Sequence, residues 1–411
     1  MLIREIIEGG SLDLNEEHLN IAKAMKQKKP TSPFSINNNS LVFDEYIVGE
    51  LVLKDLSIKL KPRNDAFNLS SYFEIIHYLY QLDKFDDLAV GLSDSTESLS
   101  VRSLSRGFCD ACRMLMQFGL TGDYITSSDY GQKISGKLDF DEFKKQLIPI
   151  NGVPFFDSHY SLNTAANQLI KAVLNRLVII DGANENLEKY QFLRNMTTVS
   201  ELDFTKEEAY SVLSKLYSPN PWYIAAIELG IKILFTMDIE YSDGSIEWLS
   251  FLENSNSLFE SYIRKALQDN LGESVIKWDK PKPFLYLRSS LSSGKKEFSP
   301  DILINFNTLS MSADAIIDVK NKVFEPSSLT NLDSVVSTSD LYQLIFYCNQ
   351  LNSRVGGLVY PSSTNNDPIE VMFDNKNDLK LYIFSVNIKQ NLIVRNKLLS
   401  EQIYDKLLRE I

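Results

Sequence analysis

The chain has 411 residues and a formal net charge of −12. This length exceeds what one hydrophobic core usually serves and predicts two or three domains. Because 44% of the residues are hydrophobic and 23% are charged, the composition excludes a wholly disordered chain. Residues 251–411 carry 18 basic and 19 acidic side chains, so the first 250 residues account for nearly all of the net negative charge. A basic nucleic-acid-binding surface over the whole chain is excluded, and a polyanion is expected to bind after residue 250.

Cysteine usage and hydropathy predict the cellular compartment. Three cysteines cannot build a disulfide framework, and the first residues are charged, unlike a signal peptide. The most apolar helical stretch, residues 222–237, contains Glu228 and Lys232 and is too short to span a bilayer. We therefore expect a soluble, cytoplasmic protein that does not enter a membrane.

The first part of the chain has the pattern of a small β-rich or α+β module. Residues 26–39 are polar and rich in Lys, Pro, Ser and Asn, which indicates a loop. Residues 41–62 alternate apolar and polar side chains around a turn at Lys54 and Asp55, which predicts a β-hairpin. A helix is expected over residues 72–82, and we place this module at residues 1–95.

The middle of the chain, residues 96–250, has helical spacing and is predicted to be mostly helical. Its clearest amphipathic stretches are residues 104–120, 163–180 and 221–237. Asn163 or Thr164 could cap the second helix, and Pro221 suits the first turn of the third.

Residues 251–411 are predicted to form an α/β domain. Helical patterns cover residues 257–270, 339–351 and 391–411, and strand patterns cover residues 301–306, 315–320, 355–360 and 379–388. The fold class expected for the whole chain is multidomain α+β, with an N-terminal β-rich module, a helical middle region and a C-terminal α/β domain.

The strongest chemical signal lies in this last domain. Asp301 precedes one expected strand, and Asp318-Val-Lys320 ends the next. Because strand side chains alternate between faces, Asp318 and Lys320 share a face, and hairpin pairing brings Asp301 beside them. Carboxylates without nearby His or Cys suit Mg²⁺ or Mn²⁺, and Glu260 on the preceding helix could be a third ligand. The metal would polarise a phosphodiester, and Lys320 would position the attacking water or neutralise transition-state charge.

A helix after these strands could complete the site. Gln343 and Tyr347 lie four residues apart and therefore share a helix face, which could point at the metal. Lys295, Lys296 and Lys322 are candidate contacts to nucleic-acid phosphates. The competing structural interpretation of Asp301, Asp318 and Lys320 is a surface ion pair at strand ends, and the collinear Glu, Gln and Tyr argue against it.

Two other motifs are interpreted as structural. Residues 131–138 approach a P-loop, but Leu138 stands where the Mg²⁺-binding hydroxyl belongs, so this chain is not expected to hydrolyse nucleotide. Cys109 and Cys112 have metal-ligand spacing but no second pair, so both are expected to pack inside a helix.

Taken in order, Glu260, Pro300-Asp301, Asp318-x-Lys320 and Gln343-x-x-x-Tyr347 resemble the PD-(D/E)xK nuclease core in its subclass with a Gln-x-x-x-Tyr helix. The wider sequence resembles the McrC family, the nuclease subunits of McrBC-type restriction systems. The matching segments cover residues 46–63, 135–145, 159–177, 258–267, 299–304, 316–322, 339–351 and 356–361.

This resemblance implies properties that the residues alone do not. It implies a nuclease that cuts double-stranded DNA only with McrB, an AAA+ GTPase that forms hexameric rings, and that stimulates its GTP hydrolysis. GTP would be bound by that partner and not by this chain. An extended arm formed by the N-terminal and middle regions would enter the pore of the partner's ring. Two nuclease subunits could pair. LlaJI-like relatives use the same pairing to cut unmethylated sites. No residue among the first 250 is assigned the GTPase-stimulating role.

Two rival hypotheses remain at this stage. In one, the chain is a catalytically inactive adaptor that activates an AAA+ ring through its acidic arm. In the other, it is a nuclease that works alone, against which its acidity and long non-nuclease portion argue.

Overall fold

A computed structural model describes residues 2–63, 67, 69–79, 99–133, 136–145, 152–180, 187–216, 221–242, 245–276, 284–288, 293–322, 324, 336–371 and 379–409. The chain divides into two compact units, Met1–Asp83 with Leu252–Ile411, and Lys84–Phe251. Of the predicted boundaries, that between residues 95 and 96 lies outside the described residues. The boundary between residues 250 and 251 falls inside strand β11 (Ser245–Asn254).

The N-terminal part of the first unit is built on strands, as the alternating pattern predicts. Strands β5 (Ile47–Leu53) and β6 (Leu56–Lys61) form an antiparallel hairpin, and β1 (Leu2–Ile7) pairs with β6 in parallel. The expected turn at Lys54 and Asp55 is confirmed, with Lys54 at a φ of 54°. A three-stranded sheet of β2 (Ser11–Asp13), β4 (Ser40–Phe43) and β3 (Phe34–Asn37) accompanies helix α1 (Glu16–Lys28).

Helix α2 (Leu69–Leu79) ends the described N-terminal part and packs against helix α9 (Ser255–Leu271). It covers the first part of the helix predicted over residues 72–82. The residues after 79 in that prediction lie outside the described ones.

The C-terminal part of the first unit is the predicted α/β domain. Its six-stranded sheet has the order β12-β15-β16-β17-β19-β18. The strands are β12 (Val275–Ile276), β15 (Ile302–Ile304), β16 (Ala315–Val319), β17 (Val355–Ser362), β18 (Ile369–Val371) and β19 (Lys380–Asn387). The central strands β16, β17 and β19 are parallel, whereas β15 pairs with β16 in antiparallel fashion.

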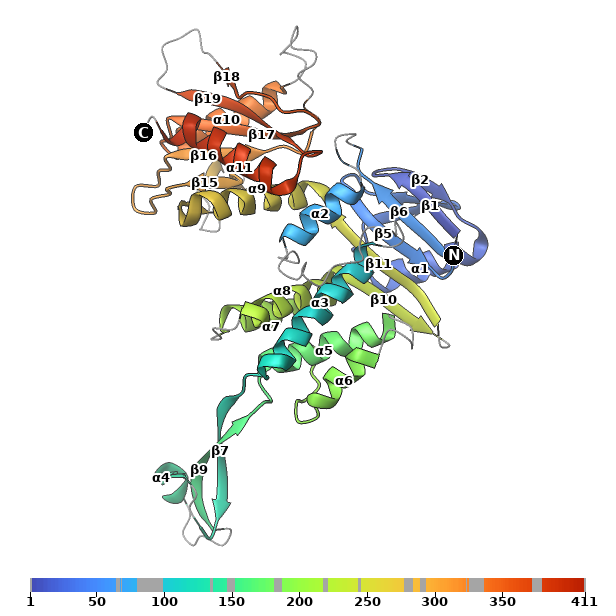
Figure 1. Cartoon of the computed structure of the whole chain (residues 1–411), viewed down its shortest axis with the longest axis vertical. Helices are drawn as coiled ribbons and strands as arrows, with labels where there is room; N and C mark the ends of the chain where they lie inside the picture. Colours follow the sequence, from blue (N-terminus) through green and yellow to red (C-terminus); the bar gives the residue numbers. More distant parts are fainter. Residues whose placement is uncertain are drawn as a thin grey trace. The chain divides into compact units, whose positions relative to one another are not determined.

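Helices cover both faces of this sheet (Figure 1). Helix α10 (Thr338–Gln350) packs on β16 and β17, and α9 and α11 (Leu392–Ile403) pack together, α9 against β16 and α11 against β19. The core under α10 joins Leu303, Ile316 and Leu358 of the sheet to Leu344 and Cys348 of the helix. A short 3-10 helix, Gly272–Ser274, follows α9, and a π-helical turn, Tyr404–Leu408, follows α11.

The second unit contains the predicted helices. Helices α3 (Leu99–Phe118), α5 (Ala165–Ile180) and α8 (Pro221–Thr236) match the three expected stretches, and α6 (Leu187–Asn195) and α7 (Lys206–Ser214) accompany them. Pro221 is the first residue of α8, and Thr164 Oγ1 accepts a hydrogen bond from Asn167 N at 3.3 Å, as expected of a helix cap. Strand β10 (Met237–Ser242) pairs with β11 after α8.

This middle region also contains strands that the sequence did not predict. Strands β7 (Asp123–Gly131) and β9 (Val153–Ser161) form a two-stranded ribbon that leaves the ends of α3 and α5 (Figure 1). A short strand β8 (Lys137–Leu138) pairs with β9, and helix α4 (Phe140–Phe143) follows it. Both faces of β7 are exposed, so its sequence lacks the alternation that would have identified it.

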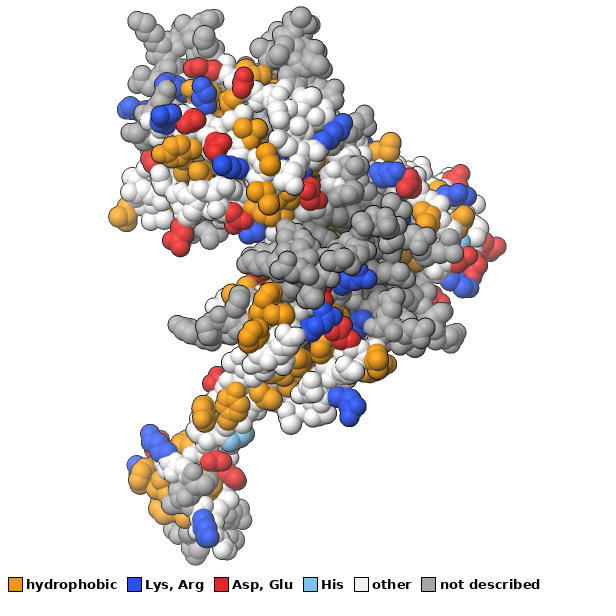
Figure 2. All heavy atoms as spheres, in the orientation of Figure 1, with side chains coloured by type: hydrophobic (Ala, Val, Ile, Leu, Met, Phe, Trp, Pro, Cys, Tyr) orange, Lys and Arg blue, Asp and Glu red, His pale blue; other side chains and the backbone are white. Residues whose placement is uncertain are grey.

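Buried polar contacts fix the base of this ribbon. Asn167 Nδ2 donates to the carbonyl oxygens of Thr121 at 3.1 Å and Leu162 at 2.8 Å, which precede β7 and follow β9. The Tyr223 hydroxyl donates to Asn167 Oδ1 at 2.8 Å and accepts from Thr121 N at 2.7 Å. Beyond this base the ribbon carries exposed aromatic side chains, among them Tyr124, Phe140 and Tyr160, and apolar side chains are visible there in Figure 2.

Among the described residues, no helix combines the length and the apolar character needed to cross a membrane.

Candidate functional site

Two carboxylates meet where β15 and β16 lie side by side. Ile302 pairs with Ile317, and one more step of this antiparallel register sets Asp301 opposite Asp318. Asp301 Oδ2 accepts a hydrogen bond from the backbone N–H of Val319 at 2.7 Å, which holds the carboxylate against β16. The sheet geometry thus brings together two acids that are seventeen positions apart in the sequence.

Both acids are held in an environment that opposes their ionisation. The side chain of Asp318 is almost completely buried. Burial, with the charge of Asp318 and a smaller effect of Glu260, raises the pKa of Asp301 well above its ordinary value of 3.8. Burial also raises the pKa of Asp318, against the opposing effect of Lys320. Neighbouring buried carboxylates repel one another, and a bound cation relieves this repulsion.

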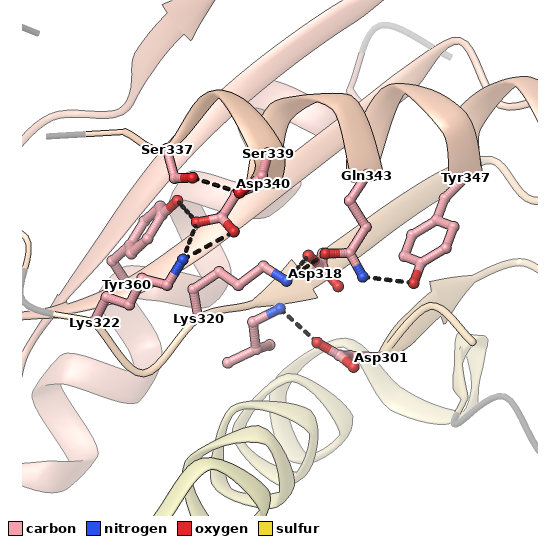
Figure 3. Close-up of polar contacts among 11 residues, drawn as sticks. Asp301, Asp318, Lys320, Lys322, Ser337, Ser339, Asp340, Gln343, Tyr347 and Tyr360 are labelled. Atoms are coloured by element: carbon pink, nitrogen blue, oxygen red, sulfur yellow. Dashed lines mark hydrogen bonds and ion pairs between the residues drawn. The ribbon is translucent and has the colours of Figure 1, made fainter. Parts of the chain in front are cut away.

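Lys320 lies on the same face as Asp318, as strand alternation predicts. Its Nζ is 2.6 Å from Asp318 Oδ2 and donates a hydrogen bond to Gln343 Oε1 at 2.8 Å (Figure 3). Burial lowers the pKa of Lys320, but the adjacent Asp318 carboxylate outweighs this and raises it overall. Lys320 is therefore an ammonium ion held between a strand carboxylate and a helix amide.

Helix α10 presents Gln343 and Tyr347 to this cluster. Gln343 Nε2 donates to the Tyr347 hydroxyl at 2.7 Å, as the spacing of four residues allows. The Tyr347 ring stacks on Phe298 with an interplanar angle of 27°, and burial raises the pKa of its hydroxyl. Figure 3 shows both side chains pointing from α10 toward the strand acids. Tyr347 fixes the amide, and the amide fixes the ammonium group.

Glu260 stands apart from this core. It lies on α9 and forms an ion pair with Arg264, whose Nη1 is 3.0 Å from Glu260 Oε1. Its charge contributes to the raised pKa of Asp301. Within the described residues, no three His, Cys, Asp or Glu side chains are grouped as a preformed metal site. The structure thus brings together Asp301 and Asp318, but it does not assemble Glu260 with them as a third ligand.

The two strand carboxylates still fit a hard divalent cation. Asp318 Oδ2 is buried and has no donor in hydrogen-bond geometry, although Lys320 Nζ makes an ionic contact with it. Oxygen ligands without nearby thiol or imidazole favour Mg²⁺ or Mn²⁺ over softer metals. A magnesium ion commonly takes only one or two protein carboxylates and completes its shell with water and phosphate oxygens.

The predicted nucleic-acid contacts have different surroundings. Lys322 Nζ lies 2.9 Å from Asp340 Oδ2, a buried carboxylate at the start of α10 that also accepts from the Tyr360 hydroxyl at 3.1 Å. Lys295 and Lys296 lie in strand β14 (Ser293–Glu297), which pairs with β13 (Phe284–Arg288). The side chains of both lysines lie outside the described part of the structure.

Asp340 was not found from the sequence. It stands three residues before Gln343, one helical turn away on the same face, and its charge acts on both Asp318 and Lys320. The sequence offered one signal, namely its position in the first turn of a helix that already carried two candidate residues. An acidic residue there usually stabilises the helix N-terminus through the helix dipole, so this signal is weak.

The two motifs interpreted as structural lie in the second unit. The P-loop-like segment runs from the end of β7 to β8, with residues 134 and 135 outside the described ones. Cys109 and Cys112 are both buried in α3.

Comparison with known proteins now assigns a family. Residues 45–361 match the family model described as "McrBC 5-methylcytosine restriction system component". The chain belongs to the McrBC family. The match covers most of the chain, and it includes both strand acids, Lys320 and the Gln343–Tyr347 helix. The family resemblance inferred from the sequence is confirmed.

Two solved McrBC structures are similar to this chain, and the first of them shares its fold. A chain of the refined half-complex from a tetradecameric assembly of Thermococcus gammatolerans McrB AAA+ hexamers with bound McrC aligns with a TM-score of 0.56 and 14% identity, covering 98% of this chain and 99% of that one. A chain of the Thermococcus gammatolerans McrBC complex aligns with a TM-score of 0.44 and 12% identity, covering 66% and 88%. The first alignment confirms a multidomain fold shared over nearly the full length. None of the curated proteins compared with this chain matches it.

Proposed function

We propose that this chain is the Mg²⁺-dependent, DNA-cleaving subunit of a McrBC-type restriction system, assembled with an AAA+ GTPase of the McrB kind. The observation that carries the proposal is the group formed by Asp301, Asp318, Lys320 and Gln343 where strands β15 and β16 meet. Family membership supports a restriction function, and the T. gammatolerans assembly, described as McrB hexamers with bound McrC, supports the proposed partner.

The chemistry of these residues suits phosphodiester hydrolysis. Asp301 and Asp318 would hold Mg²⁺ or Mn²⁺, and Glu260 would act on the site through its charge. When bound, the metal supplies Lewis-acid chemistry that polarises a phosphodiester. Lys320, kept protonated by Asp318, would stabilise negative charge on the phosphate oxygens. Gln343 and Tyr347 would hold the ammonium group in place, and Lys295 and Lys296 would contact the DNA backbone.

Cleavage of linear double-stranded DNA by the full chain with its partner, GTP and Mg²⁺ tests this proposal. Asp318→Asn and Lys320→Ala should each reduce cleavage at least about a hundredfold while the partner's GTPase stimulation persists. DNA cleavage by either variant at the wild-type rate would show that the assigned residues are not catalytic. Omitting the partner and GTP distinguishes a nuclease that works alone.

The alternative is an adaptor that activates the GTPase ring without cleaving DNA. The arrangement of Lys320 between Asp318 and Gln343 argues against a decayed site, because such a cluster of buried charge is costly to retain without use. Calorimetric titration of the chain with Mn²⁺ separates the two functions. Binding that disappears in Asp301→Asn supports the nuclease, whereas no binding in the wild-type chain favours the adaptor.

A further inference from the structure

A tyrosine of the N-terminal part reaches the catalytic strand. Tyr72 lies on α2, and its side chain is almost completely buried. Asn321 Nδ2 donates to its hydroxyl at 3.4 Å. Burial raises the pKa of the Tyr72 phenol, and the polar side chains of Asn321 and of Ser255, in the first turn of α9, partly oppose this rise. The hydroxyl thus lies between α9 and the segment that follows β16.

The residue that Tyr72 contacts is next to Lys320. The backbone of this segment is tied to the sheet by Lys320 N, which donates to the Val359 carbonyl at 2.9 Å. The side chain of Asn321 has few other restraints, since its Oδ1 is buried and has no hydrogen-bond partner among the described residues. The Tyr72 hydroxyl is therefore the contact that orients Asn321 as the chain leaves the strand.

Aromatic packing adds a second link to the site. The Phe67 and Tyr72 rings lie 4.7 Å apart, and Phe67 meets Phe259 of α9 edge to face at 5.6 Å. Phe259 directly precedes Glu260, the acid whose charge acts on Asp301. The same two aromatic residues of the N-terminal part thus contact the neighbours of both Lys320 and Glu260.

Helices α2 and α9 are also the elements next to the two points where the chain passes between the units. The second unit begins at Lys84, shortly after α2 ends, and its last residue, Phe251, lies four positions before α9 begins at Ser255. Both chain connections between the units therefore lead into the two helices that Tyr72 joins. Ser255 Oγ is also hydrogen bonded to the buried carboxylate of Glu8 at 3.2 Å.

We infer that Tyr72 is a positioning residue for the proposed nuclease site, acting through Asn321 on the backbone that carries Lys320. This inference rests on the proposed function and adds that the nuclease domain depends on α2 for full activity. Through this contact, a displacement of α2 would change the placement of the Lys320 ammonium group.

Tyr72→Phe tests the inference because it removes the hydroxyl and keeps the ring. We expect kcat for DNA cleavage, in the complex with partner and GTP, to fall about tenfold with an unchanged KM for DNA. Tyr78→Phe is the matched control, since Tyr78 lies on the same helix and its hydroxyl donates to Asp269 of α9 at 2.6 Å. That variant should cleave like the wild-type chain. A fall of equal size in both variants would mean that α2 contributes stability only.

A double-mutant cycle with Asn321→Ala separates positioning from general structure. If Tyr72 acts through Asn321, the double variant should cleave no more slowly than Asn321→Ala alone. Amide exchange gives a readout independent of cleavage: the peptide spanning residues 319–322 should exchange severalfold faster in Tyr72→Phe, and as in wild type in Tyr78→Phe. Additive losses, or unchanged exchange, overturn the inference. A wild-type complex that does not cut DNA instead overturns the proposed function.

Discussion

At the scale of single residues, the site contains more negative than positive charge. Lys320 balances one of the two strand carboxylates, while Arg264 already pairs with Glu260 and Lys322 with Asp340. One buried carboxylate is therefore left to be neutralised by a proton or a metal ion. Since the pKa of Asp301 is raised, the apo chain binds a proton there under conditions in which an exposed aspartate would be ionised.

The competition between protons and metal predicts a pH-dependent stabilisation. The unfolded chain ionises Asp301 near its ordinary pKa of 3.8, whereas the folded chain resists ionisation, so this group costs stability as the pH rises above that value. At the proposed site, Mg²⁺ would bind the ionised form and remove this cost. The rise in Tm caused by Mg²⁺ should therefore increase between about pH 6 and about pH 8 in thermal unfolding followed by fluorescence.

Asp301→Asn is the control for this measurement. It removes the titrating group and one ligand together, so Mg²⁺ should then change Tm little at any pH. An equal Mg²⁺ effect at all pH values in the wild-type chain would contradict the assignment of the ion to this carboxylate.

Loss of the Gln343 amide should reduce DNA cleavage more than loss of the Tyr347 hydroxyl. Gln343→Leu removes the acceptor for Lys320 and leaves the ammonium group free to turn toward Asp318 alone, so we expect cleavage to fall about 10- to 100-fold. Tyr347→Phe keeps the stacking on Phe298 and loses only the hydroxyl that holds the amide, so a fall of a few-fold is expected. Single-turnover cleavage rates measure both, and the reverse order would exclude Gln343 as the residue that orients Lys320.

The sequence alone predicts that Asp301, Asp318 and Lys320 lie together, because strand alternation and hairpin pairing relate residues that are close in the sequence. Gln343 and Tyr347 followed from helical spacing. Tyr72 and Asn321 could not be found in this way, since their contact joins positions 249 apart and no local period relates them. The buried partner of Lys322, Asp340, escaped notice for the same reason, because only the tertiary structure removes it from solvent.

At the scale of elements, β17 fixes how closely α10 approaches the sheet. Gly356 and Gly357 are adjacent on this strand and therefore face opposite sides. A Cβ on Gly356 would lie 2.8 Å from Cys348 Sγ and 3.1 Å from Leu344 Cδ1, both on α10. A Cβ on Gly357 would instead lie 2.9 Å from Phe384 and 3.4 Å from Leu407 on the other face. Substitutions at these two glycines would therefore each displace the elements on one face of the sheet and leave the other face in place.

Gly356→Ala should displace α10 and, with it, Gln343 and Tyr347. Both Gly356→Ala and Gly357→Ala should cost about 1–3 kcal/mol of unfolding free energy through overpacking. Only the first moves the helix that holds Lys320, so its DNA cleavage should fall at least about tenfold at a temperature where both variants are folded. Urea unfolding measures the stability change. Equal cleavage by both variants would show that the position of α10 is not critical.

Elements were predictable where their residues face a core. The helices α3, α5 and α8 and the hairpin of β5 and β6 show the periodicity of a buried face. The predicted bounds of α5 and α8 are correct within two residues, whereas α3 begins five residues before its predicted start and the hairpin begins six residues after its own. Strand β7 is exposed on both faces, and only Pro154 and Phe155 of β9 are buried, so burial leaves little periodic pattern in the sequence of the ribbon. The base of the ribbon is held by Asn167 and Tyr223, whose side chains form hydrogen bonds with backbone atoms. No sequence pattern predicts such contacts.

At the scale of the whole molecule, each unit contains its own set of functional candidates. The proposed metal site lies wholly in the unit formed by Met1–Asp83 and Leu252–Ile411, and the exposed ribbon lies wholly in the unit Lys84–Phe251. The family resemblance implies an arm that enters a GTPase ring, and the ribbon is the element of the second unit that best suits this role, since its aromatic side chains Tyr124, Phe140 and Tyr160 are exposed. We therefore expect stimulation of the partner and cleavage of DNA to be separable by mutation.

Shortening the ribbon tests this separation. Thr126 and Ser158 are directly opposed across β7 and β9, and their hydroxyl groups are hydrogen bonded at 2.9 Å. Replacing residues 127–157 with Asn-Gly, which favours a two-residue hairpin turn, should close the shortened ribbon without disturbing its base. Stimulation of the partner's GTP hydrolysis should then fall at least about tenfold, because the deletion removes the exposed side chains of Tyr130, Phe140 and Phe143 from the outer part of the ribbon.

The shortened chain should still bind the metal. The informative comparison is therefore between the shortened chain and Asp318→Asn. Its Mg²⁺-dependent rise in Tm should equal that of the full chain, because no residue of the proposed site lies between positions 127 and 157. Asp318→Asn should show the opposite combination, with normal GTPase stimulation and no cleavage. If the shortened chain stimulated the partner fully, the arm would have to be another element; if it lost Mg²⁺ stabilisation as well, the two units could not be functionally independent.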